Sequence, residues 1–82
     1  MAQYTVLLAH DPDTGVYTVK VPALPGCGTE GDSVEEALEM ARDAIVGNLQ
    51  ARAEEGWEIP VEEPRYIVAT VEVPVPALVG AK

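Results

Sequence analysis

Basic residues are scarce in this sequence, and cysteine and aromatic residues are scarcer still. Five Lys and Arg residues stand against 14 Asp and Glu residues in a chain of 82, which gives a formal net charge of −9. Nucleic-acid-binding proteins draw much of their affinity from Lys and Arg side chains that neutralise phosphates. We therefore expect no direct binding of DNA or RNA, and a basic protein is the better-matched partner. The basic residues are scattered singly, at Lys20, Arg42, Arg52, Arg65 and Lys82.

The single cysteine, Cys27, has no second cysteine in the chain with which to form a disulfide. No group of Cys and His residues has the spacing of a zinc site, so no metal or other cofactor is expected. The apolar stretch near the N-terminus is short, and residues 68–80 are interrupted by Pro74 and Pro76. The sequence thus predicts neither a signal peptide nor a membrane span, and it favours a soluble protein of the cytoplasm.

A chain of 82 residues is long enough for one domain and too short for two. A domain of this size buries only about 60 to 65% of the surface that its unfolded chain exposes. Its core must be economical or be completed by another subunit. We therefore expect a homo-oligomer, either a dimer or a tetramer.

Two β-strands are predicted at residues 3–9 and 16–21, where β-branched and aromatic residues are frequent. The turn-forming sequence HDPDTG lies between them, so the two strands form a hairpin. In the second strand Tyr17, Val19 and Val21 alternate with polar residues, which predicts one buried face. A short third strand is predicted at residues 27–30, after a segment rich in proline and glycine.

A long amphipathic helix is predicted to begin at Val34 and to end before Gly56. Ser33 and Glu36 form a capping box, in which the serine hydroxyl accepts from the Glu36 amide and the Glu36 carboxylate reaches back to the serine amide. Gly56 suits the position just after a helix, where Trp57 can contact the last turn. The apolar stripe repeats every three or four residues. It comprises Leu38, Ala41, Ile45 and Leu49, with Ala37, Ala44 and Ala53 beside them.

A last strand is predicted at residues 66–73, after a connection punctuated by prolines, and Pro74 ends it. The predicted order is β-β-β-α-β, an α+β domain with an antiparallel, hairpin-based sheet and one helix on one face. The domain spans residues 1–73, and residues 74–82 form a proline-containing tail. Three interpretations of this apolar tail stay open: disorder, packing on a neighbouring subunit, or the remainder of a lost C-terminal domain.

The ordered spacing of these features resembles the HicB family of type II antitoxins. The resemblance implies a partial ribonuclease H-like fold without catalysis, encoded beside a small basic HicA toxin that cleaves mRNA and whose active site the antitoxin masks. Many members of the family continue into a DNA-binding segment, whereas only residues 74–82 follow the last expected strand here. The resemblance is therefore to a short form without that segment. It rests on Val21-Pro22, Leu24-Pro25-Gly26-Cys27, Gly31-Asp32-Ser33, Glu36-Ala37-Leu38, Ala41, Ala44, Gly56 and Ile59-Pro60.

Catalytic and metal-binding alternatives find little support in the residues. Asp11 and Asp13 resemble the start of a calcium loop, but the downstream ligands are missing, so a plain turn is predicted. His10 and Cys27 lack a third group that would orient them, and Ser33 is needed as the helix cap. The carboxylates form no convergent set for metal-dependent RNA cleavage. We expect no enzyme activity.

A cluster of acidic residues is the predicted partner-binding site. Its alternative interpretation is ordinary solvated charge that caps the helix, and the two interpretations are compatible. The sequence thus predicts an antitoxin-like binding module that neutralises a basic toxin. The alternative is an orphan homo-oligomeric module, structural or regulatory, with no cognate toxin. The cluster consists of Glu30, Asp32, Glu35, Glu36 and Glu39.

Overall fold

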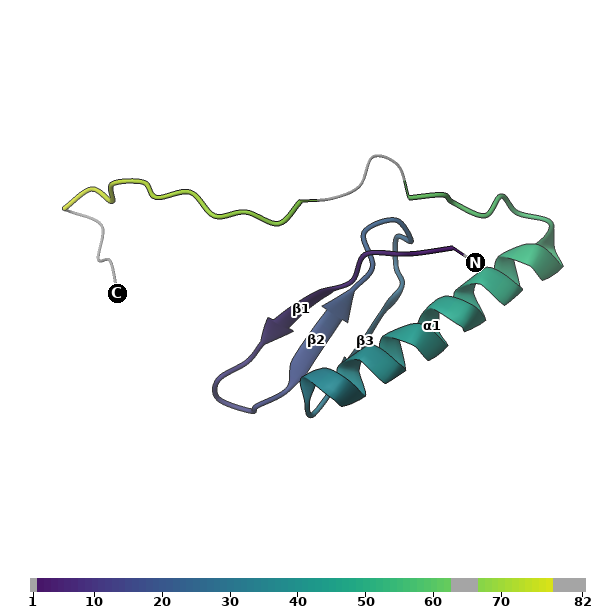
Figure 1. The fold of residues 1–82 in the computed structure, drawn as a ribbon, viewed down its shortest axis with the longest axis horizontal. Coiled ribbons are helices and arrows are strands. Elements are labelled where there is room, and N and C mark those ends of the chain that lie inside the picture. The colour runs from purple at the N-terminus through teal and green to yellow at the C-terminus, as the bar shows by residue number, and fades with distance from the viewer. Residues whose placement is uncertain (1, 63–66, 78–82) are drawn as a thin grey trace.

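Three short antiparallel strands and one long helix are the regular elements among the described residues (Figure 1). A computed structural model describes residues 2–62 and 67–77. The predicted α+β class and the order β-β-β-α are confirmed. The elements are β1 (Leu7–His10), β2 (Tyr17–Lys20), β3 (Gly28–Gly31) and α1 (Val34–Glu55).

The strands form one sheet in the order β1-β2-β3, with β2 in the centre. Val19 of β2 pairs with Leu8 of β1 and with Thr29 of β3. The predicted hairpin is confirmed, although β1 begins at Leu7 rather than at residue 3. The hairpin turn closes through a 2.9 Å hydrogen bond that the Asp11 amide donates to the Val16 carbonyl. The third strand, β3, is shifted by one residue from its predicted bounds.

The helix covers one face of the sheet and lies against β3 and β2 (Figure 1). As predicted, Val19 and Val21 are buried on that face, while Thr18 and Lys20 are exposed on the other. Among the described residues the buried core is small, and it divides into two adjoining clusters. One contains Val19, Ala37 and Ala41, and the other contains Val21, Leu24 and Cys27.

A glycine sets the close packing of α1 on β3. A Cβ atom built on Gly31 would lie 2.6 Å from the backbone nitrogen of Ala37 and 2.7 Å from its Cα. No side chain fits in that space. Because Gly31 has none, the first turn of the helix can lie directly against the end of β3.

Both ends of α1 are capped by local hydrogen bonds. The Glu36 amide donates to the Ser33 hydroxyl at 3.0 Å, as predicted. The Glu36 carboxylate accepts from the Asp32 amide at 2.8 Å rather than from the Ser33 amide of a standard capping box. At the other end Gly56 has φ 73°, and the Trp57 amide donates to the Arg52 carbonyl at 2.8 Å, which completes a Schellman motif.

The buried stripe of the helix lies slightly to one side of its predicted position. Ala37 and Ala41 are fully buried, whereas Leu38 remains 45% exposed and Ala53 is exposed. The small alanine side chains allow the helix to approach the sheet closely, and the longer Leu38 then lies at the flank of the contact. Ile45 and Leu49 are partly buried against the second core cluster.

The strand predicted at residues 66–73 is wrong over its described part, residues 67–73, which form no strand. Residues 67–77, named here the C-terminal arm, instead run away from the sheet as an extended chain (Figure 1). The radius of gyration is accordingly 16.4 Å, against about 12 Å for a compact chain of this length. β-branched residues favour extended backbone, but a strand also needs a neighbouring edge with which to pair. Tyr66 and residues 78–82 lie outside the described residues.

Candidate protein-binding surface

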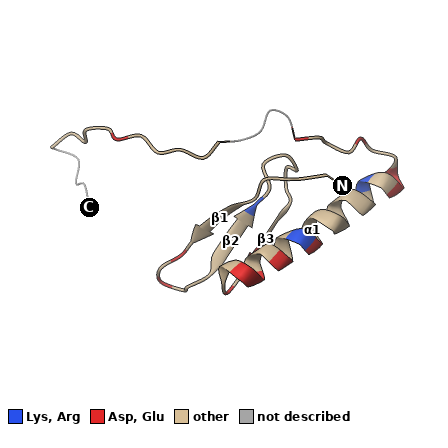
Figure 2. Cartoon of the chain, viewed as in Figure 1, with Lys and Arg blue, Asp and Glu red and all other residues tan. Residues whose placement is uncertain are grey.

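The acidic residues singled out in the sequence lie around the junction of β3 and α1. Asp32 occupies the turn between the two elements, and Glu35 and Glu36 lie in the first turn of the helix (Figure 2). All are exposed, together with Glu39 one turn further along. The structure thus brings Asp32 and the helix acids together at one end of the domain.

Glu30 does not share a face with the helix acids. It pairs across the sheet with Thr18, next to Val19, whose side chain is buried under the helix. Because successive side chains of a strand alternate between faces, Glu30 lies on the sheet face opposite the helix. The predicted cluster therefore wraps around the end of the domain instead of forming one flat patch.

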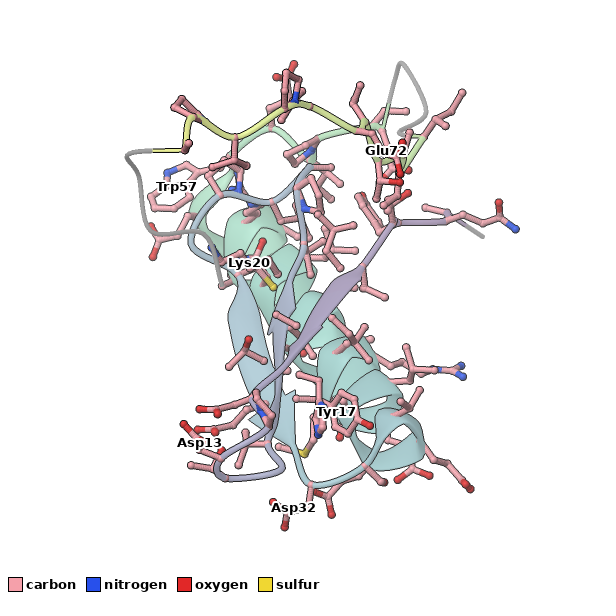
Figure 3. All side chains as sticks on the ribbon, turned by 90° about the vertical axis from the view of Figure 1, so that its left-hand side faces the viewer. Asp13, Tyr17, Lys20, Asp32, Trp57 and Glu72 are labelled. Atoms are coloured by element: carbon pink, nitrogen blue, oxygen red, sulfur yellow. The ribbon has the colours of Figure 1, made fainter. Side chains whose placement is uncertain are left out.

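Two further acids, for which a plain turn is the sequence-based prediction, reach the same end. Asp11 and Asp13 lie in the β1–β2 turn, and Figure 3 shows Asp13 and Asp32 at the same end of the molecule, with Lys20 and Trp57 well away from it. The antiparallel order of the three strands is the signal that could have placed these acids, because it brings the β1–β2 turn and the β3–α1 turn to the same end of the sheet. The acidic end is defined here as Asp11, Asp13, Asp32, Glu35, Glu36 and Glu39.

Hydrogen bonds to the backbone shape this end of the molecule. Asp11 accepts from the Asp13 amide at 2.9 Å, and Thr14 accepts from the Val16 amide at 3.2 Å, so side chains stabilise the turn. Glu36 is occupied by the helix cap. Asp32 and Glu35 keep their carboxylates exposed, and these two side chains are well placed to meet a positively charged surface.

The candidate catalytic residues are not brought together. His10 pairs with Tyr17 at the turn end of the hairpin and stacks on its ring, with centroids 4.4 Å apart. Cys27 is buried beside Gly28, which pairs with Lys20 at the opposite end of β2. The Ser33 hydroxyl accepts the cap hydrogen bond. A base and a nucleophile at opposite ends of a sheet cannot act on one substrate atom.

Over residues 2–62 and 67–77, no three His, Cys, Asp or Glu side chains converge in a way that would hold a metal ion. In the same part of the chain, no helix has both the length and the apolar character needed to cross a membrane.

Comparison with known proteins places the chain among antitoxin-like sequences. The sequence model of a family described as HicB-like antitoxin of bacterial toxin–antitoxin systems matches residues 4–75. A UPF0150 protein of Thermoplasma acidophilum is 41% identical over 58 residues, which cover 71% of this chain and 83% of that protein.

Two longer proteins of Photorhabdus laumondii, named antitoxin HicB 1 and antitoxin HicB 2, are each 39% identical to the chain. The chain spans about half of their length, 43% of the first and 54% of the second. The crystal structure of the N-terminal domain of Burkholderia pseudomallei antitoxin HicB is also similar, with a TM-score of 0.62 and 28% sequence identity. The similarity covers 82% of this chain and 72% of that one.

Proposed function

The chain belongs to the HicB-like antitoxin family of bacterial toxin–antitoxin systems, and on that premise we propose that it neutralises a small basic toxin of the HicA type. It is a non-catalytic binding module of the cytoplasm that masks the active site of an mRNA-cleaving partner. It assembles as a homo-oligomer, a dimer or a tetramer, and does not bind nucleic acid directly.

The acidic end is the observation that supports this mechanism best. An enzyme that cleaves mRNA must present positive charge to the phosphates of its substrate. An exposed set of carboxylates such as Asp32 and Glu35 attracts the same surface and competes with RNA for it. Binding is then both electrostatic, which accelerates encounter, and steric, because the domain occupies the space of the substrate.

The first experiment recovers the partner with a tagged full-length chain from native lysate and identifies it by mass. A small basic protein whose cleavage of mRNA stops when the chain is added would support the proposal. Recovery of a self-associated oligomer alone would contradict it and favour the second candidate, an orphan homo-oligomeric module without a toxin. The long, exposed apolar arm is the observation that favours this second candidate.

The second experiment tests the acidic end with charge reversals. Asp32→Lys combined with Glu35→Lys changes the charge by four and leaves the capping residues Ser33 and Glu36 unaltered. We expect affinity for the toxin to fall at least about tenfold, with a weaker dependence on salt. The matched control, Glu54→Lys with Glu55→Lys at the far end of the helix, should change affinity by less than about twofold. Equal effects of the two pairs would show that net charge alone governs binding and that the acidic end is not the site.

A further inference from the structure

The C-terminal arm exposes an unusual amount of apolar side chain for its length. Ile67 is 90% exposed, Val71 85% and Val73 71%. These residues and Ala69 occupy alternate positions, so they share one face of an extended chain. Thr70 and Glu72 lie on the opposite face, together with Val68, which is 75% exposed. The arm therefore has the pattern of a half-buried strand, although none of its described residues pairs with another strand.

The segment that leads into the arm is held beside the start of β1. The Tyr4 hydroxyl donates to the Pro60 carbonyl at 2.7 Å. The Thr5 amide and the Thr5 hydroxyl each donate to a Glu62 carboxylate oxygen at 2.6 Å. These contacts fix the chain just ahead of Leu7, where β1 begins, and beyond them the arm departs from the sheet (Figure 1).

The outer edge of β1 is the complementary feature of the same chain. β2 pairs with one side of β1, and the sheet order leaves the other side free of any described strand. The helix lies over β3 and β2, so the part of the core beside β1 is thinly covered. Val6 and Leu8 pack against the buried core there but are only partly buried themselves.

We propose that the arm is an exchanged strand: residues 67–73 of one copy pair with the free edge of β1 in a second copy, and the second arm returns the contact. The face formed by Ile67, Val71 and Val73 then covers the thin side of the core beside β1. A two-fold axis closes the exchange, so the β1 edge and the arm of each copy find partners. Pro74 lacks an amide hydrogen and ends the pairing. The arm runs away from its own sheet (Figure 1), and the matching surface that the chain itself offers is the β1 edge of a second copy.

This inference deepens the self-association part of the proposed function and is independent of toxin binding. Its first test is light scattering of the full-length chain beside two variants. Val71→Asp places a charge on the apolar face of the arm, and we expect the dimer dissociation constant to rise about a hundredfold, because the charge becomes buried without a partner. Thr70→Asp, the matched control on the opposite face, should leave the dimer largely intact.

The second test distinguishes exchange from pairing within one chain. Ala9→Cys and Thr70→Cys are made in separate, differently sized chains that also carry Cys27→Ala, and the mixture is treated with a short bismaleimide. Exchange joins one chain of each size. A chain with both substitutions that cross-links only to itself would overturn the exchange.

The remaining outcomes separate this inference from the proposed function. A full-length chain that is monomeric at micromolar concentration would overturn both the exchange and the proposed self-association. A Val71→Asp variant as dimeric as the unmodified chain would overturn the exchange alone, because self-association would then use another surface.

Discussion

The β3–α1 unit and the C-terminal arm are both rich in small and β-branched apolar residues, yet only the first is packed. In the β3–α1 unit, Ala37 and Ala41 are fully buried against the sheet, and a capped helix start fixes their position. In the arm, Ile67 and Val71 remain almost entirely exposed. Apolar pattern is thus common to both regions, and what differs is whether the same chain supplies the opposing surface.

Sequence distance explains this difference. The β3–α1 unit joins its two elements through a turn of two residues, so β3 and the helix start pack against each other at little cost in chain entropy. The arm follows a helix of 22 residues and a proline-rich connection, so any partner for it is distant in sequence. The β3–α1 unit therefore packs within one copy, whereas the contact that the arm makes can be supplied by a second copy.

The largest expected effect comes from breaking the packed region at its centre. Ala37→Asp buries a charge with no partner and should destabilise the domain by about 4 kcal/mol or more, which is enough to abolish cooperative unfolding in urea. Leu38→Asp, one residue further along the same helix, should cost about 1 kcal/mol, because that side chain is 45% exposed. Equal losses at the two positions would contradict the observed helix orientation.

A smaller effect is expected where the helix meets β3. Gly31→Ala forces a methyl group against the Ala37 backbone and should lower the free energy of unfolding by about 2 kcal/mol. Gly47→Ala is the matched control, since a Cβ atom there meets nothing within 4 Å. Gly47→Ala should raise the free energy of unfolding by about 0.5 to 1 kcal/mol, because alanine is a better helix former than glycine in a helix interior. Urea denaturation monitored by circular dichroism measures both, and a loss at Gly47 would count against this account of the packing.

The same contrast explains which parts of the fold could be predicted from the sequence. The helix bounds, Val34 and Glu55, depend on local capping signals, and the hairpin depends on a turn sequence, so these predictions were confirmed. The strand predicted at residues 66–73 was wrong over residues 67–73, because β-propensity does not state which edge will accept a strand.

The candidate site was only partly predictable for a related reason. Asp32, Glu35 and Glu36 are neighbours in the sequence, and the structure keeps them together. Asp11 and Asp13 join that end only through the register of the sheet, whereas strand alternation turns Glu30 to the opposite face. Both outcomes depend on pairing between strands, which single-residue patterns do not encode.

The smallest expected effect lies in the arm, and it sharpens the comparison between the two regions. At concentrations low enough to separate the copies, Val71→Asp should change the free energy of unfolding of the β3–α1 unit by less than about 0.5 kcal/mol, because the side chain already meets solvent. At concentrations that favour the dimer, the same variant should lose the concentration-dependent rise in melting temperature that exchange gives the unmodified chain. Thermal unfolding over a dilution series measures both. A loss of stability that is the same at every concentration would mean that the arm packs on its own sheet, and the division between a packed unit and an exchanged arm would then fail.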